Sequence, residues 1–370
     1  YFSLSIYPPS VPVNLELIQN GVQQSLLQAG ALFKPCFCGP CFGAGDVPAN
    51  NGLSIRHTTR NFPNREGSKP GEGQFAGVCL MDARSIAATA ANGGRITPAT
   101  DLDYTPVHHE YHFDDTVYKN RVYYGFGKAD PSVELQMGPN ITDWPKMYQL
   151  SENLLVELAA VIHDPVTTTD ELIPSGETSS YRSNPLRLAE FTLSRRVPEY
   201  VERSKAVAQQ EKARREGAVS DRLRQVLSRV GDADQLAGST QFGSAVFANK
   251  PGDGSAREQA ASCQKVLGGF ANICYQFATK RYRSNCINWG ILPFTLDEGT
   301  PFDYESGDCV FVPHIRQAVE QGREDIPAKV ICQDGSVHDL LLHVKGLTAD
   351  EKEILLRGCL MNYYAARNKE

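Results

Sequence analysis

Segments of helical and of strand-like periodicity alternate along the first third of the chain, and this alternation constrains the fold most strongly. Leucine, isoleucine and valine recur at helical spacing over residues 13–30, which predicts an amphipathic helix ending at Gly30. A short strand should follow from Ala31, and Asp82 should cap a second helix over the alanine-rich residues 83–92. Alternating strands, loops and helices predict a layered α/β fold.

The remainder of the chain predicts a second domain. Alternating apolar residues over 107–125 indicate a β-hairpin. Residues 126–150 contain glycine, proline and asparagine with little periodicity, so we interpret them as a linker. The apolar run 155–161 predicts the first strand of the next domain. We therefore expect one domain at 1–125 and a second at 151–370.

Composition excludes several classes of protein. The 370 residues are 41% hydrophobic and 22% charged, which is typical of a globular chain with an ample core. No apolar run approaches the roughly 18–20 residues that a membrane helix needs. The net charge of −6 gives no general attraction to nucleic acid, and acids interleave with bases in the charged stretch 193–230. We expect neither a membrane nor a nucleic-acid partner.

The ten cysteines do not form the pattern of a small disulfide-rich domain. Seven are scattered in apolar contexts and are interpreted as buried, reduced thiols, which predicts a reducing compartment, the cytoplasm. The other three cluster at Cys36, Cys38 and Cys41. Cys36 lies on an incoming strand-like segment and is not expected to bind metal.

Cys38 and Cys41 form a Cys-x-x-Cys motif around a Gly-Pro turn. The turn can direct both sulfurs to one metal or cluster, although zinc sites and redox dithiols share this spacing. Arg60 and Arg65 follow in a proline-containing loop, and their planar guanidinium groups suit carboxylates if they are more than solvated surface residues. Together these features indicate a dehydratase of a small polycarboxylic acid.

The order of the motifs resembles the aconitase superfamily of aconitases, homoaconitases and isopropylmalate isomerases. Residues 37–43, 60–65 and 83–90 resemble its third domain. Residues 168–176 and 254–261 resemble two signatures of its mobile fourth domain. The resemblance implies the C-terminal half of such a hydratase, with a three-layer α/β/α domain followed by a swivelling mixed β/α domain.

The resemblance also implies roles for individual residues. Cys38 and Cys41 would bind a [4Fe–4S] cluster whose third cysteine ligand lies outside this chain, and its open iron would act as a Lewis acid. Ser255 would be the catalytic base and Arg257 would support it. The implied substrate-binding residues are Thr59, Arg60, Arg65, Arg182 and Ala256.

The residues around Ser255 allow two interpretations. Asp253, Gly254 and Ser255 form a turn before a helix predicted to start near Ala256, and the N-terminus of a helix favours negative charge. The same pattern also fits a serine that caps the helix and an arginine on the surface. For Arg182, a solvated surface role is equally compatible with the pattern.

Three departures from the family pattern favour a divergent bacterial hydratase branch over a true aconitase. Thr59 replaces an asparagine, Ala256 replaces a serine and Glu171 replaces a histidine. Only 37 residues precede Cys38 and they match none of the family's earlier domains, so the expected partner is an N-terminal part of the same protein or a separate large subunit.

Three functions are compatible with these observations. The first is a hydro-lyase acting on a di- or tricarboxylic hydroxy acid. The second is a non-catalytic binding or regulatory protein without the cluster, and the third is a catalytically inactive remnant. Retention of the cysteines, arginines and serine of the motifs favours the first.

Overall fold

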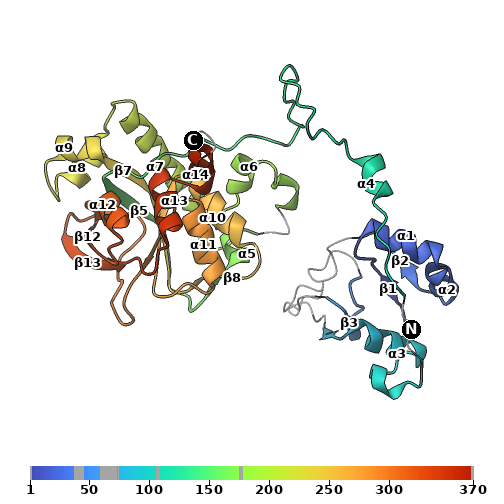
Figure 1. Ribbon diagram of the computed structural model, residues 1–370. Coiled ribbons are helices and arrows are strands. Elements are labelled where there is room, and N and C mark those ends of the chain that lie inside the picture. Colours follow the sequence, from blue (N-terminus) through green and yellow to red (C-terminus); the bar gives the residue numbers. More distant parts are fainter. Residues whose placement is uncertain are drawn as a thin grey trace. The chain divides into compact units, whose positions relative to one another are not determined.

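The structure, a computed structural model, divides the chain into two compact units, Tyr1–Glu134 and Leu135–Glu370, coloured blue to teal and green to red in Figure 1. The boundary falls inside residues 126–150, the stretch predicted as a linker. The structure describes residues 2–36, 46–58, 73, 75–105, 109–174 and 178–367. No helix among these residues is long and apolar enough to cross a membrane.

The first unit combines short helices with two pairs of parallel strands. Its helices are α1 (Val11–Gln19), α2 (Val22–Gln28), α3 (Ala83–Ala91), η2 (Ala99–Asp101) and α4 (Thr116–Arg121). Its described strands are β1 (Ser5–Ile6), paired with β2 (Leu32–Phe33), and β3 (Gly52–Arg56), paired with β4 (Ala76–Leu80). The α/β class is confirmed, and the three-layer arrangement of this unit stays a prediction.

Capping interactions explain where the helices of the first unit begin. The predicted cap of α3 is confirmed, because Asp82 accepts hydrogen bonds from the amides of Arg84 and Ser85 at 3.0 and 3.1 Å. The prediction of one helix over 13–30 is wrong. Two helices occur instead, because Gly21 adopts a left-handed conformation (φ 78°) that interrupts the first and starts the second.

The hairpin predicted over 107–125 is also wrong: the described part of this stretch contains α4 and no strand. Local side chains stabilise the helix. Asp114 accepts a hydrogen bond from the Thr116 amide at 2.9 Å, and Lys119 pairs with Asp115 one turn away at 2.9 Å. Alternating apolar residues therefore did not indicate a strand here, because aspartates at the start of the segment favoured a helical turn.

The second unit is built around a closed barrel of mixed parallel and antiparallel strands, in the order β10-β13-β12-β11-β5-β7-β9. Figure 1 labels β5, β7, β12 and β13 of this barrel. The predicted strand over 155–161 is confirmed within β5. The barrel strands are β5 (Asn153–Ile162), β7 (Thr240–Ala248), β9 (Gly269–Cys274), β10 (Leu292–Thr295), β11 (Cys309–Val312), β12 (Asp325–Ile331) and β13 (Val337–His343).

Helices surround this barrel. Two short strands, β6 (Thr167–Thr168) and β8 (Pro251–Asp253), pair outside it. The helices are α5 (Thr169–Leu172), η3 (Ser179–Tyr181), α6 (Pro185–Ala189), α7 (Tyr200–Arg215), α8 (Asp221–Leu227), α9 (Ala233–Ser239), α10 (Arg257–Val266), α11 (Lys280–Asn288), α12 (Ile315–Gln321), α13 (Ala349–Arg357) and α14 (Leu360–Arg367). The charged stretch 193–230 contains α7 and α8.

Strand β5 shows why the core is located inside the barrel. Leu154, Val156 and Leu158 alternate along it and pack into the interior, whereas Leu155 joins a separate cluster on the outer face. Both faces of the strand are buried, and its sequence is accordingly a nearly continuous apolar run. Each fully buried side chain of this kind contributes about 1.5–3 kcal/mol relative to an exposed one.

Candidate functional site

Two of the sequence motifs meet at one edge of the second unit. Strand β6 pairs in parallel with β8, so the segments that follow these strands, α5 and the loop into α10, begin on the same side. The Ala256 amide donates a hydrogen bond to Thr169 Oγ1 at 3.3 Å. Figure 1 shows α5, β8, α10 and α11 on one side of the barrel. The structure thus joins the motif at 168–176 to the motif at 254–261.

Two glycines allow this close approach. Gly254 has φ 130°, and a Cβ atom at this position would lie 2.2 Å from Thr169 Oγ1. Gly252 has φ 95°, and a Cβ atom there would lie 2.2 Å from Tyr282 Cδ1. Any side chain would clash in both places and would strain the backbone. The loop can therefore contact the α5 segment only because both positions are glycine.

Glu171, one of the departures from the family pattern, has a structural role. Its amide donates to Thr168 Oγ1 at 3.2 Å, and its carboxylate accepts from the Thr168 amide at 2.6 Å. This reciprocal arrangement is a capping box, and it fixes the start of α5. The Thr-x-x-Glu spacing signals this box in the sequence. Neither the box nor the contact made by Thr169 was among the sequence-based expectations.

The start of α10 presents Ser255 to solvent. Ala256 occupies the N-cap position and supplies no side-chain hydrogen bond, so Ser255 is not the side-chain cap of this helix. Arg257, which is partly buried, is the first helical residue. The helix N-terminus carries a partial positive charge and Arg257 adds a full one. Negative charge is consequently favoured beside Ser255.

Arg182 lies on an element that neighbours this loop. It follows η3 directly, its side chain is exposed, and the chain then enters α6. Helix α6 packs against α10. The structure thus places Arg182 and Ser255 on segments that are adjacent through α6 and α10.

A closed network of buried polar groups contains Tyr282, the residue that Gly252 in the loop before α10 contacts. The amide nitrogen of Gln264 donates to the Tyr282 hydroxyl at 3.0 Å, and that hydroxyl donates to Asn272 Oδ1 at 3.3 Å. Asn272 Nδ2 completes the ring by donating to Gln264 Oε1 at 3.0 Å. Burial raises the pKa of Tyr282 well above its usual value, so the hydroxyl stays protonated. These hydrogen bonds therefore fix the aromatic ring of Tyr282, against which Gly252 packs.

The predicted residues of the first unit lie outside the described residues. These are Cys38, Cys41, Thr59, Arg60 and Arg65. Cys36 is described: its side chain is exposed and its Sγ donates to the Pro9 carbonyl at 3.1 Å. Within the part of the chain that the structure describes, no group of three or more His, Cys, Asp or Glu side chains could hold a metal ion.

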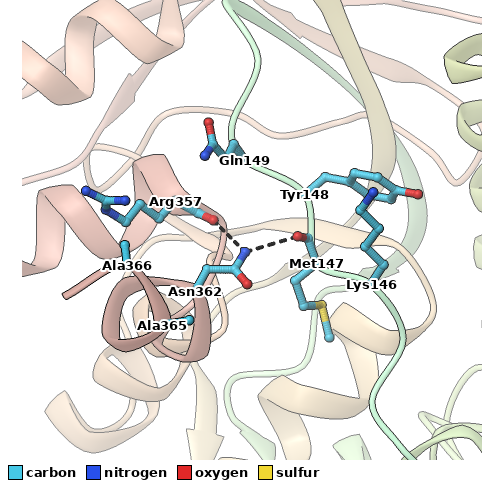
Figure 2. A pocket seen from close by; sticks show the side chains of 8 residues that line it. All are labelled: Lys146, Met147, Tyr148, Gln149, Arg357, Asn362, Ala365 and Ala366. Atoms are coloured by element: carbon cyan, nitrogen blue, oxygen red, sulfur yellow. Dashed lines mark hydrogen bonds between the residues drawn. The ribbon is translucent and has the colours of Figure 1, made fainter. Parts of the chain in front are cut away.

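A cavity of about 420 Å³ lies elsewhere in the second unit, between residues 146–149 and helices α13 and α14 (Figure 2). Asn362 joins its two sides by donating to the Met147 carbonyl at 3.0 Å and to the Arg357 carbonyl at 2.8 Å. None of the residues predicted to act in catalysis or binding lines it.

Comparison with known proteins finds a family match in each of two parts of the chain. Residues 1–88 match the Aconitase family (aconitate hydratase), and residues 209–299 match the Aconitase C-terminal domain. The first match includes the Cys-x-x-Cys motif and the second includes the Ser255 loop. Both regions of the chain are thus similar to aconitase-family proteins.

Individual relatives agree with this assignment. A putative mitochondrial aconitate hydratase of Emericella nidulans is 23% identical over 98% of this chain and 46% of that protein. A mitochondrial homoaconitase of Cryptococcus neoformans is 26% identical over 74% of this chain and 33% of that protein. A 3-isopropylmalate dehydratase large subunit of Rubrobacter xylanophilus is 36% identical over 26% of this chain and 22% of that protein. The chain thus spans less than half the length of these relatives.

Proposed function

We propose that this chain is the C-terminal part of an iron–sulfur hydro-lyase that hydrates, dehydrates or isomerises a small di- or tricarboxylic hydroxy acid. The observation that carries the proposal is the exposed Ser255 just before α10, close to Arg257 and next to Ala256, whose amide donates to Thr169 Oγ1. The matches to two aconitase family models support it, and two of the relatives are named as a hydratase and a dehydratase.

Ser255 would act as the base. A hydro-lyase removes a proton from the carbon next to the one that loses hydroxide, and Ser255 Oγ would accept that proton. A serine alkoxide is normally too basic to form at neutral pH. The positive end of the ten-residue helix α10 and the guanidinium of Arg257 would stabilise it.

The other predicted residues would bind the substrate. Arg60, Arg65 and Arg182 would each bind a carboxylate through the planar guanidinium group. Thr59 and Ala256 would be further substrate contacts. Cys38 and Cys41 would hold a [4Fe–4S] cluster together with a third thiolate from outside this chain, and the bound cluster would supply a Lewis acid for the departing hydroxyl.

The proposal includes the partner and the compartment. The partner would be an N-terminal part of the same protein or a separate large subunit, the name that the Rubrobacter relative carries. The compartment would be the reducing cytoplasm. The eight described cysteines, which are all free thiols, support this part of the proposal.

The test is Ser255→Ala in the complete protein, assayed on a panel of di- and tricarboxylic hydroxy acids. Loss of the base should lower kcat by about two to four orders of magnitude with a small change in KM, because the carboxylate-binding groups remain. Ser228→Ala, at an exposed serine after α8, is the matched control and should keep full activity. A normal kcat for Ser255→Ala on every acid would contradict the proposal.

A further inference from the structure

The first residues of the second unit make specific contacts although they form neither a helix nor a strand. Residues 135–152 contain no regular element, yet residues 140–144 contact two segments far away in the sequence. We term residues 140–144 the strap. Because the second unit begins at Leu135, the strap lies at the point where the chain enters that unit.

One end of the strap holds the loop that contains Arg182. The Thr142 amide donates to the Ser183 carbonyl at 3.1 Å, and the side-chain amide of Asn140 donates to the Ser180 carbonyl. These two contacts lie on either side of Arg182. The strap therefore fixes the backbone from which the arginine side chain projects.

Asn184 connects the same contacts to α6. Its Oδ1 accepts from Thr142 Oγ1 at 3.1 Å, and its Nδ2 donates to Asn140 Oδ1 at 3.3 Å. Oδ1 also accepts from the Arg187 amide at 3.0 Å, so Asn184 is the N-cap of α6. One side chain thus joins the strap to the start of the helix that packs against α10.

The other end of the strap reaches α10 through two tryptophans. Trp144 contacts Trp289, with ring centroids 4.4 Å apart and planes inclined by 40°. Trp289 Nε1 donates to Glu258 Oε1 at 3.0 Å. Glu258 follows Arg257 directly in the first turn of α10. The strap consequently contacts both the Arg182 loop and, through Trp289, the start of the helix behind Ser255.

We propose that the strap, through Asn140, Thr142 and Trp144, positions the Arg182 loop relative to the start of α10. The proposed function assigns these two segments to substrate binding and catalysis, and the catalytic part of the inference rests on it. Holding both segments by one short stretch fixes the spacing between a carboxylate-binding group and the base. Misplacement of such groups by about 1 Å can slow an enzyme about a hundred-fold.

The first experiment uses the isolated chain and does not depend on any activity. Trypsin cleaves folded chains mainly where a loop opens locally, so Asn140→Ala and Trp144→Ala should accelerate cleavage after Arg182. Trp144→Phe retains an aromatic contact and should cleave at the parental rate. Tyr123→Ala changes an exposed aromatic residue outside the strap and is the control. Equal cleavage in all variants would overturn the proposal.

Tryptophan fluorescence gives a second reading on the same samples. The chain contains two tryptophans, and both belong to this contact. Trp289 is the one tryptophan left in both Trp144→Ala and Trp144→Phe. It should emit at longer wavelength in Trp144→Ala than in Trp144→Phe, because water replaces the aromatic ring that covers it. In Asn140→Ala, where only the hydrogen bonds to the loop are lost, a smaller shift is expected. Unchanged Trp289 emission in Trp144→Ala would show that the contact does not form.

The last experiment measures kinetics in the complete enzyme. Trp144→Ala should lower kcat/KM by about ten-fold, a moderate loss for misplaced rather than missing groups, and Trp144→Phe should restore it. Faster cleavage at Arg182 with unchanged kcat/KM would reject the positioning role. That result differs from failure of the proposed function, in which Ser255→Ala would keep a normal kcat.

Discussion

The two units of this chain differ sharply in how they bury apolar side chains. In the second unit, every residue of β7 and nearly every residue of β5 is buried. In the first unit, the described helix α2 has no buried residue, and Leu53 on β3 is 56% exposed. The barrel strands are thus buried on both faces, whereas the described elements of the first unit leave much of their apolar surface exposed. Free energy of unfolding should accordingly depend on different interactions in the two units.

The largest expected difference concerns large apolar residues in strands. Phe247→Ala on β7 should lower the free energy of unfolding by about 3–5 kcal/mol, because the fully buried ring stacks on Phe302 with centroids 3.9 Å apart. Leu53→Ala on β3 should change it by less than about 0.5 kcal/mol. Urea unfolding followed by circular dichroism measures both. Similar losses for the two variants would remove the contrast between the units.

A pH-dependent effect is expected from Lys265, a buried lysine of α10. Its Nζ donates to the Gly290 carbonyl at 3.1 Å and lies 4.1 Å from the Phe270 ring centre. Burial lowers the pKa of Lys265 to about 7, whereas an exposed lysine titrates near 10.4. Between these values the unfolded chain binds a proton that the folded chain does not. This group therefore makes stability rise with pH from about 7 to about 10.

Lys265→Met removes that rise. Relative to the parent, the variant should be most favoured below pH 7, where the folded parent carries a buried charge, and this advantage should shrink by about 4 kcal/mol as the pH increases to about 10. Lys212→Met, at an exposed position of α7, is the control and should follow the parent curve. Urea unfolding at pH 6 to 10 provides the measurement, and parallel curves for parent and Lys265→Met would contradict it.

The smallest expected effect tests a local interaction in the first unit. Asp82→Ala removes the side chain that caps α3 and should destabilise this helix by about 1 kcal/mol. Hydrogen exchange of the α3 amides should accelerate about five-fold, while exchange in β7 stays unchanged. Asp82→Asn, which retains the cap, serves as the control. Equal acceleration in β7 would show that the two units unfold together.

Local interactions explain which features could be predicted from the sequence. The cap of α3, the strand at β5 and the start of α10 after Gly254 all depend on residues within a few positions of one another. The one helix predicted over 13–30 is interrupted at Gly21, and the hairpin predicted over 107–125 is replaced by α4, which begins directly after two aspartates. In both cases one or two local residues decide the conformation against the broader apolar periodicity.

The sequence by itself determined the family motifs, the α/β class and the residues proposed for catalysis and binding. Only the tertiary structure decided which of the motifs lie next to each other. The contact between Ala256 and Thr169 joins residues 87 positions apart, and it depends on the parallel pairing of β6 with β8. The contact between Trp144 and Trp289 likewise joins distant segments. Capping and periodicity act over three or four residues and can be recognised in a sequence, whereas contacts between distant segments form only when the whole barrel packs.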